Sequence, residues 1–186
     1  MDSFSLTDHF LIAMPNMTDP HFAGAVVYLC EHSEHGAMGV VVNKPAEVTL
    51  GELFDQIDLP LLNPEQVGHP VYLGGPVQTD RGFVLHQPLD NWNATLAVND
   101  DTGLTTSRDV LVAVSQGDGP YRMLITLGYA GWGAGQLEQE LAQNAWLTVP
   151  ANLDCIYGQP PEARFAAAMQ LLGFDPLALS GEAGHA

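Results

Sequence analysis

Three side chains near the start of the chain have types and spacing that suit metal binding. Cys30, His32 and His35 follow the pattern Cys-x-His-x-x-His, and thiolate and imidazole groups are common zinc ligands. In an extended strand the side chains of residues 30 and 32 point to the same side, and a following turn could bring His35 back toward them. A further ligand is needed, and His69 or His86 is only a spatial guess for it. We therefore predict neither a metal site nor a bound cofactor.

The same part of the chain offers a second chemistry, nucleophilic catalysis. Cys30 could form a thiolate–imidazole pair with His32 or His86, and Ser107 precedes a helical pattern where a hydroxyl could be activated. The chain has no G-x-S-x-G motif, however, and Cys30 follows an apolar strand, in which a thiol is packed and inert. Ser107 is expected to cap the helix. An enzyme of unknown specificity using Cys30, His32 and His86 is thus the alternative hypothesis.

Residues 127–146, LGYAGWGAGQLEQELAQNAW, hold four glycines between an apolar strand and a helical pattern. A phosphate-binding loop would need a lysine and a hydroxyl after the last glycine, whereas Gln136 and Leu137 follow Gly135. Glu138, in the first turn of the helix, would repel a phosphate. We therefore expect the glycines to permit tight backbone packing around Trp132.

Aromatic side chains beside glycines at strand ends could line a pocket for a small ligand. Such pockets are apolar, with a few polar groups that orient the ligand. The residues that we predict for this pocket are Tyr72, Gly74, Gly75, His86, Tyr129, Gly131 and Trp132.

The charge balance excludes whole classes of partner. Five basic against 22 acidic residues give a net charge of −17, and Lys44 is the only lysine. Affinity for nucleic acids and for anionic membranes comes largely from lysine and arginine, so we predict neither kind of binding. The sequence separations of the five cations argue against their convergence. No apolar run approaches the length of a membrane span, no secretory signal is visible, and the two cysteines suit reduced thiols, so we expect a cytoplasmic protein.

These residues lie on, or next to, many short expected strands, which alternate along the chain with four short expected helices. This alternation predicts a single α+β domain over residues 1–186. Expected strands are residues 9–14, 25–31, 37–43, 71–73, 83–86, 95–98, 104–106, 121–130, 145–149 and 153–157, and residues 80–82 are expected to form a turn. The expected helices begin after Thr49, Ser107 and Gly135 and at the pair 160–161, and the last one ends at Gly173 with Phe174 as its apolar contact.

Ten short blocks, in order along the chain, carry a family resemblance. They are CEH (30–32), GAMG (36–39), NKP (43–45), YLGGPV (72–77), DRGFVLH (80–86), TSRD (106–109), LGYAGW (127–132), GQLE (135–138), NAWL (144–147) and AGHA (183–186). Together they resemble the YqgE/AlgH family of small bacterial proteins. The resemblance implies a cytoplasmic protein with a branched or barrel-like, mixed or antiparallel sheet surrounded by short helices. It also implies the label of transcriptional regulator, without a catalytic set or cofactor.

Charge and resemblance together favour binding and regulation over turnover. We expect a regulatory protein that acts through a protein partner or a small-molecule ligand, with any effect on transcription indirect. Direct DNA binding ranks last, because the acidic surface would repel a polyanion.

Overall fold

The computed structural model describes residues 5–173, so Phe174 and the block at 183–186 lie outside the described residues. The strands are β1 (His9–Ala13), β2 (Val26–Ser33), β3 (Gly36–Val41), β4 (Pro45–Thr49), β5 (Pro70–Leu73), β6 (Val77–Gln87), β7 (Thr95–Ala97), β8 (Gly103–Thr105), β9 (Arg122–Gly133) and β10 (Trp146–Pro150). The helices are α1 (Leu50–Gln56), α2 (Arg108–Ser115), α3 (Gln136–Ala142), α4 (Asp154–Tyr157) and α5 (Arg164–Gln170), with a 3-10 turn, η1 (Pro161–Ala163), before α5.

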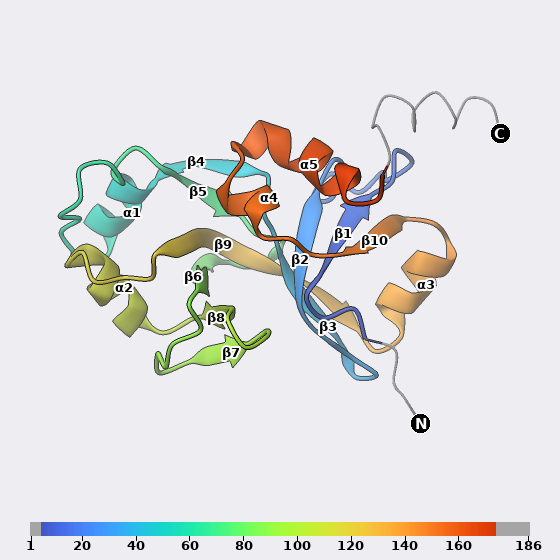
Figure 1. Cartoon of the computed structure of the whole chain (residues 1–186), viewed down its shortest axis with the longest axis horizontal. Coiled ribbons are helices and arrows are strands. Elements are labelled where there is room, and N and C mark those ends of the chain that lie inside the picture. Colours follow the sequence, from blue (N-terminus) through green and yellow to red (C-terminus); the bar gives the residue numbers. More distant parts are fainter. Residues whose placement is uncertain (1–4, 174–186) are drawn as a thin grey trace.

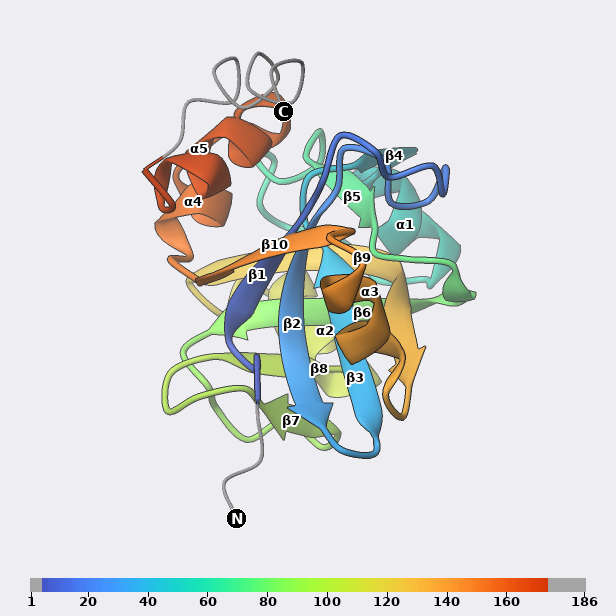
Figure 2. The ribbon, with the colours of Figure 1, turned by 90° about the vertical axis from the view of Figure 1, so that its right-hand side faces the viewer.

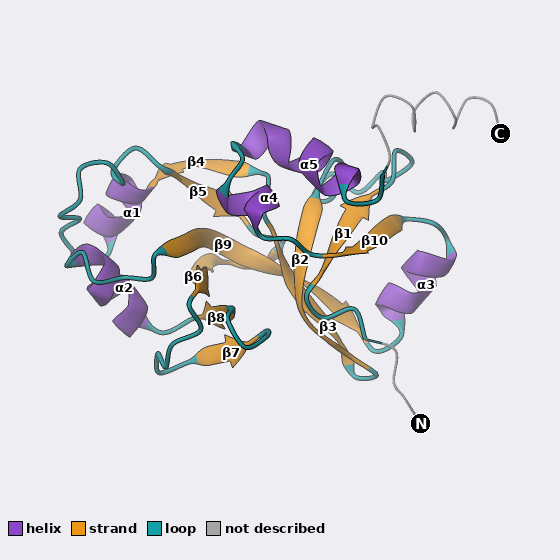
Figure 3. Ribbon diagram, in the orientation of Figure 1, coloured by secondary structure: helices purple, strands orange, loops and turns teal. Residues whose placement is uncertain are grey.

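The strands form one curled and branched sheet with short helices around it (Figures 1 and 3). Its main path runs β10-β1-β2-β3-β9-β6-β8-β7, with antiparallel neighbours throughout. The branch lies at β9, which pairs with β3 along residues 130–133 and, in parallel, with β5 at residues 126–127. The predicted α+β class, the mixed strand pairing and the branch are confirmed.

Glycines permit the close approach of backbones at this branch. Gly75 and Gly128 both have positive φ, +153° and +77°. A Cβ on Gly75 would lie 2.2 Å from the carbonyl carbon of Tyr129, and one on Gly128 would lie 2.5 Å from the oxygen of Gly75. The glycine-rich block therefore begins inside β9 rather than in a loop, and its tightest contacts are between strands. Gly135, with φ +77°, begins α3 as predicted.

Side chains of the predicted hairpin, β2 and β3, are buried on both faces of the sheet. Tyr28 of β2 packs in a core that α4 and α5 cover, with Ile156 and Met169. Its neighbour Leu29 packs in a second core with Leu137 of α3, on the opposite face. A third core joins α1 and α2 to β5, β6 and β9. Figure 2 shows α3 and the α4–α5 pair at different sides of β1–β3.

Three local predictions were wrong. The predicted strand 153–157 instead contains α4 (Asp154–Tyr157), and the helix starts where Asp154 N donates to Asn152 Oδ1. Residues 80–82 lie within β6, at an irregularity in its pairing with β9, instead of in a turn. Ser107 does precede α2, but its Oγ makes no capping bond; it accepts from Ala94 N and donates to Asp109 Oδ1. Among the helices of residues 5–173, none is long and apolar enough to cross a membrane.

Candidate functional site

A cleft of about 440 Å³ opens between β5, the start of β9 and the α4–α5 region. We call it the arginine cleft. Its polar and aromatic lining comprises Gln66, His69, Tyr72, Tyr121, Arg122, Tyr157 and Arg164. The apolar part of the wall includes Leu50 of α1 and Leu124 of β9. The volume lies in the range of sites for small molecules.

Arg122, the first residue of β9, forms one side of the arginine cleft. Its Nη2 donates to Asp154 Oδ1 of α4 at 2.9 Å, and its Nη1 donates to Gln87 Oε1 at 3.3 Å. The guanidinium also lies 5.5 Å from the centre of the Tyr157 ring, a cation–π arrangement. Arg122 is therefore held in place by protein partners on β6 and α4.

Arg164, the first residue of α5, is far more deeply buried, with 8% of its surface exposed. Its Nη1 donates to Val42 O at 2.7 Å and its Nε donates to Gln159 O at 3.0 Å. The guanidinium lies 4.9 Å from the centre of the Tyr72 ring. Within residues 5–173 it makes no salt bridge, so its charge is balanced only by dipoles and an aromatic face.

The two tyrosines at the mouth of the arginine cleft differ in their surroundings. Tyr157 donates its hydroxyl hydrogen to Leu85 O at 3.2 Å, and burial raises the pKa of this phenol despite the nearby Arg122. Tyr157 thus stays neutral at physiological pH. Tyr121 has 72% of its surface exposed and offers a free aromatic face.

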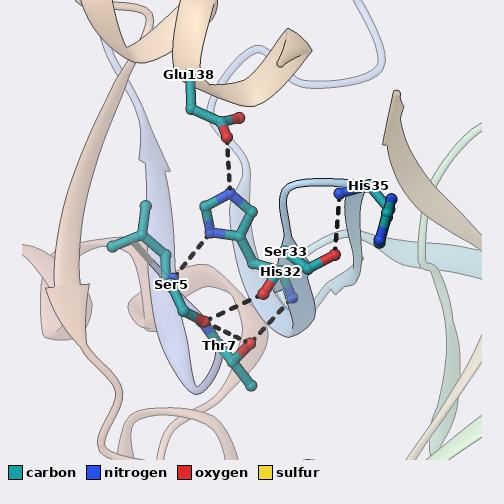
Figure 4. A network of polar contacts seen from close by, with 7 residues as sticks. Ser5, Thr7, His32, Ser33, His35 and Glu138 are labelled. Carbon is teal, nitrogen blue, oxygen red and sulfur yellow. Dashed lines mark hydrogen bonds and ion pairs between the residues drawn. The ribbon is translucent and has the colours of Figure 1, made fainter. Parts of the chain in front are cut away.

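A second, smaller pocket of about 240 Å³ lies at the tip of the β2–β3 hairpin. It is lined by Glu31, Ser33, His35, Gly36, Ala37, Met38 and Trp132. Beside it, His32 forms hydrogen bonds with residues at the start of the described chain (Figure 4). Leu6 N donates to His32 Nδ1 at 2.9 Å, and His32 N donates to Thr7 Oγ1 at 2.9 Å. Nε2 of His32 lies 3.4 Å from Glu138 Oε2 of α3.

The predicted common side of Cys30 and His32 is wrong because β2 contains a bulge. Leu29 pairs with Gly39 and Glu31 with Met38, so Cys30 is an extra residue that reverses the alternation of side chains. Cys30 packs in the core under α4 and α5, whereas His32 reaches α3 on the other face. Burial also raises the pKa of the Cys30 thiol. Among residues 5–173, no three His, Cys, Asp or Glu side chains are arranged to hold a metal ion.

His86 is fully buried in β6, and its imidazole is held by protein groups. Its Nε2 shares a 2.7 Å hydrogen bond with Thr105 Oγ1, and its Nδ1 lies 2.9 Å from Pro88 O. Burial lowers the pKa of this imidazole. The contacts give His86 a structural role in joining β6 to β8.

The structure distributes the seven predicted pocket residues over several places. Tyr72 lines the arginine cleft and Trp132 lines the smaller pocket. Gly74, Gly75 and Tyr129 lie at the branch of the sheet, and Gly131 lies further along β9.

Sequence reasoning missed Arg122, Arg164, Tyr121 and Tyr157. The sequence separations of the five cations did not indicate that two of them meet, yet β9 and α5 bring Arg122 and Arg164 to one cleft. The available signal was the rarity of basic residues in a chain of net charge −17, where a buried arginine needs partners that compensate its charge.

Comparisons with known proteins agree on one family. A family model described as AlgH-like matches residues 10–177. A "UPF0301 protein" of Chromobacterium violaceum is 61% identical over 186 residues, and one of Laribacter hongkongensis is 59% identical over 186 residues; both alignments cover each chain completely.

Two solved structures extend the likeness to the fold. The solution structure of the AlgH protein from Pseudomonas aeruginosa matches with a TM-score of 0.80 and 48% identity, covering 100% of both chains. A crystal structure of a protein from Corynebacterium diphtheriae shares the fold, with a TM-score of 0.69 and 22% identity over 91% of this chain and 89% of the other. The chain therefore belongs to the AlgH-like family.

Proposed function

We propose that this protein is a regulatory protein of the cytoplasm that binds a small-molecule ligand in the arginine cleft and passes its state on to a protein partner. One observation carries the proposal: two of five cations line a single cleft with three tyrosines, in a chain of net charge −17. Aromatic walls with a few fixed polar groups are typical of sites for small molecules.

Binding is favoured over turnover because the reactive side chains are held in inert settings. Burial raises the pKa of both Cys30 and Cys155, so neither is a thiolate at neutral pH. Cys30 and His32 lie on opposite faces of the sheet, and both ring nitrogens of His86 have protein partners. The Cys30, His32 and His86 enzyme hypothesis thus has no arrangement to support it.

Any effect on transcription is proposed to be indirect, because the same charges disfavour DNA binding. Duplex DNA is bound mainly by cations that neutralise its phosphates. Two of the five cations of this chain lie in the arginine cleft, and Arg122 is already paired with Asp154. A regulatory role is therefore proposed to work through a partner protein.

A thermal-shift screen with metabolites tests the proposal. A ligand that binds only the folded state raises Tm, and the shift grows with the logarithm of the ligand concentration above Kd. We expect hits whose shift is lost in Tyr121→Ala and Arg122→Gln but kept in Arg81→Gln. The exposed Arg81 is not a lining residue of the cleft; it donates to Gln78 and lies over the Phe83 ring. Hits lost in Trp132→Ala instead would move the site to the smaller pocket, and the proposal for the arginine cleft would fail.

A further inference from the structure

We infer that Arg164 is the anchor for an acidic group, so that the ligand of the arginine cleft is a small organic anion with a planar ring. This inference rests on the proposed function and specifies its ligand. Arg164 is 8% exposed and makes no salt bridge within residues 5–173, which is uncommon for an arginine. A charged group taken out of water at this depth is costly unless partners compensate it.

The partners of Arg164 compensate its charge only in part. Nε and Nη1 each donate to a backbone carbonyl, and the Tyr72 ring lies beneath the guanidinium. The remaining nitrogen, Nη2, makes no hydrogen bond to any residue from 5 to 173, although Arg164 lines the cleft. A guanidinium that is fixed by two hydrogen bonds and keeps an unused donor is pre-organised to receive an oxygen acceptor.

The lining of the arginine cleft adds a charge argument. None of its residues within the described chain is Asp or Glu, in a protein with 22 acidic residues. The nearby Asp154 forms a salt bridge with Arg122, so that Arg164 is the cation of the cleft without a carboxylate partner among the described residues. The cleft is therefore a positive site in an acidic protein, and a carboxylate or phosphate group fits it.

The rest of the cleft indicates what the acidic group is attached to. Tyr121 is exposed at the mouth, and Leu124 lines the apolar wall. A planar ring can stack on the free face of Tyr121 while its acidic substituent reaches Arg164. A cleft of about 440 Å³ has room for such a ligand.

Titration of the 15N-labelled protein with four probes tests the inference. Benzoate and phenyl phosphate carry the two kinds of acid, benzamide is the neutral isostere, and inorganic phosphate lacks the ring. We expect benzoate or phenyl phosphate to shift the Arg164 Nε–H resonance and to bind about tenfold more tightly than benzamide. The stronger of the two acids identifies the natural head group, and inorganic phosphate alone should bind more weakly than phenyl phosphate.

Two variants distinguish the contribution of the Arg164 guanidinium from that of the rest of the cleft. Arg164→Lys keeps the charge but loses the planar fork, so benzoate affinity should fall about tenfold, whereas Arg81→Gln should change nothing. If Arg164→Lys does not fold, the comparison of benzoate with benzamide in the unmodified protein still decides. Equal binding of benzoate and benzamide in the cleft would overturn the anion inference and leave the pocket standing. Shifts confined to residues outside the cleft, or none with any probe, would overturn the proposed function as well.

Discussion

Arg164 in the arginine cleft and His32 near the hairpin tip are both buried polar side chains. They differ in how many of their polar atoms have partners within the protein. His32 contacts Leu6, Thr7 and Glu138, so the protein itself occupies the positions around the ring (Figure 4). Arg164 donates to two backbone carbonyls and also lines the arginine cleft. Burial alone therefore does not indicate a ligand site, whereas a buried cation with an unused donor beside a cleft does.

The largest expected effect is that of Arg164→Gln. The substitution removes two charged hydrogen bonds and leaves the carbonyls of Val42 and Gln159 without this donor. The free energy of unfolding should fall by about 3 kcal/mol, since hydrogen bonds to charged groups are worth about 1.5–3 kcal/mol each. Urea denaturation measures the loss. If Arg164→Gln left both stability and benzoate binding unchanged, the two buried side chains would not differ as described.

His32→Leu should cost less and should spare the ligand. The buried Leu6 N loses its acceptor, which predicts a loss of about 1–3 kcal/mol in the free energy of unfolding. His32→Asn places an oxygen near the position of Nδ1 and should recover part of that loss. Benzoate should bind both variants as it binds the unmodified protein. Weaker binding would show that the His32 cluster and the cleft are coupled.

Lowering the pH should destabilise the protein through His86, a third buried side chain with protein partners. Burial lowers the pKa of this imidazole in the folded state, so the unfolded chain binds the proton more readily. Stability should therefore decrease as the pH falls below about 6.5, by at most about 1.4 kcal/mol per pH unit from this group. Urea denaturation at several pH values between 7.5 and 5 measures how the free energy of unfolding changes with pH. His86→Gln should flatten this dependence, and an unchanged slope would assign the effect to other groups.

Asp154→Asn should have the smallest effect on stability and the opposite effect on binding. The pair with Arg122 is partly exposed, and such pairs contribute about 0–1 kcal/mol. Removing the carboxylate frees Arg122 and makes the cleft more positive, so benzoate should bind a few-fold more tightly. Calorimetric titration of benzoate gives the answer. Weaker binding in Asp154→Asn would indicate that Asp154 orients Arg122 for the ligand.

Much of the fold was predictable from local patterns. Thr49 accepts from Glu52 N at the start of α1, and Gly135 begins α3 with positive φ, as the sequence indicated. The bulge at Cys30 was not predictable, because an extra residue in β2 depends on how β3 pairs with it. The four-residue α4 is too short to leave a periodic apolar pattern.

The arginine cleft was hidden for a different reason. Tyr72, the one residue of it that was predicted, lies on β5, whereas Arg122 opens β9 and Arg164 opens α5. Only the packing of α4 and α5 over the start of β9 brings these side chains together. The spacing of residues along the sequence does not indicate a contact between elements so far apart in the chain.

A crystal structure of the protein with 4-bromobenzoate would show where the ring and its carboxylate bind, because bromine is located by its anomalous signal. We expect an anomalous peak in the arginine cleft beside Tyr121, with the carboxylate hydrogen-bonded to the guanidinium of Arg164. A peak at the hairpin tip near Trp132, or a bound ring whose carboxylate points to solvent away from Arg164, would contradict this expectation.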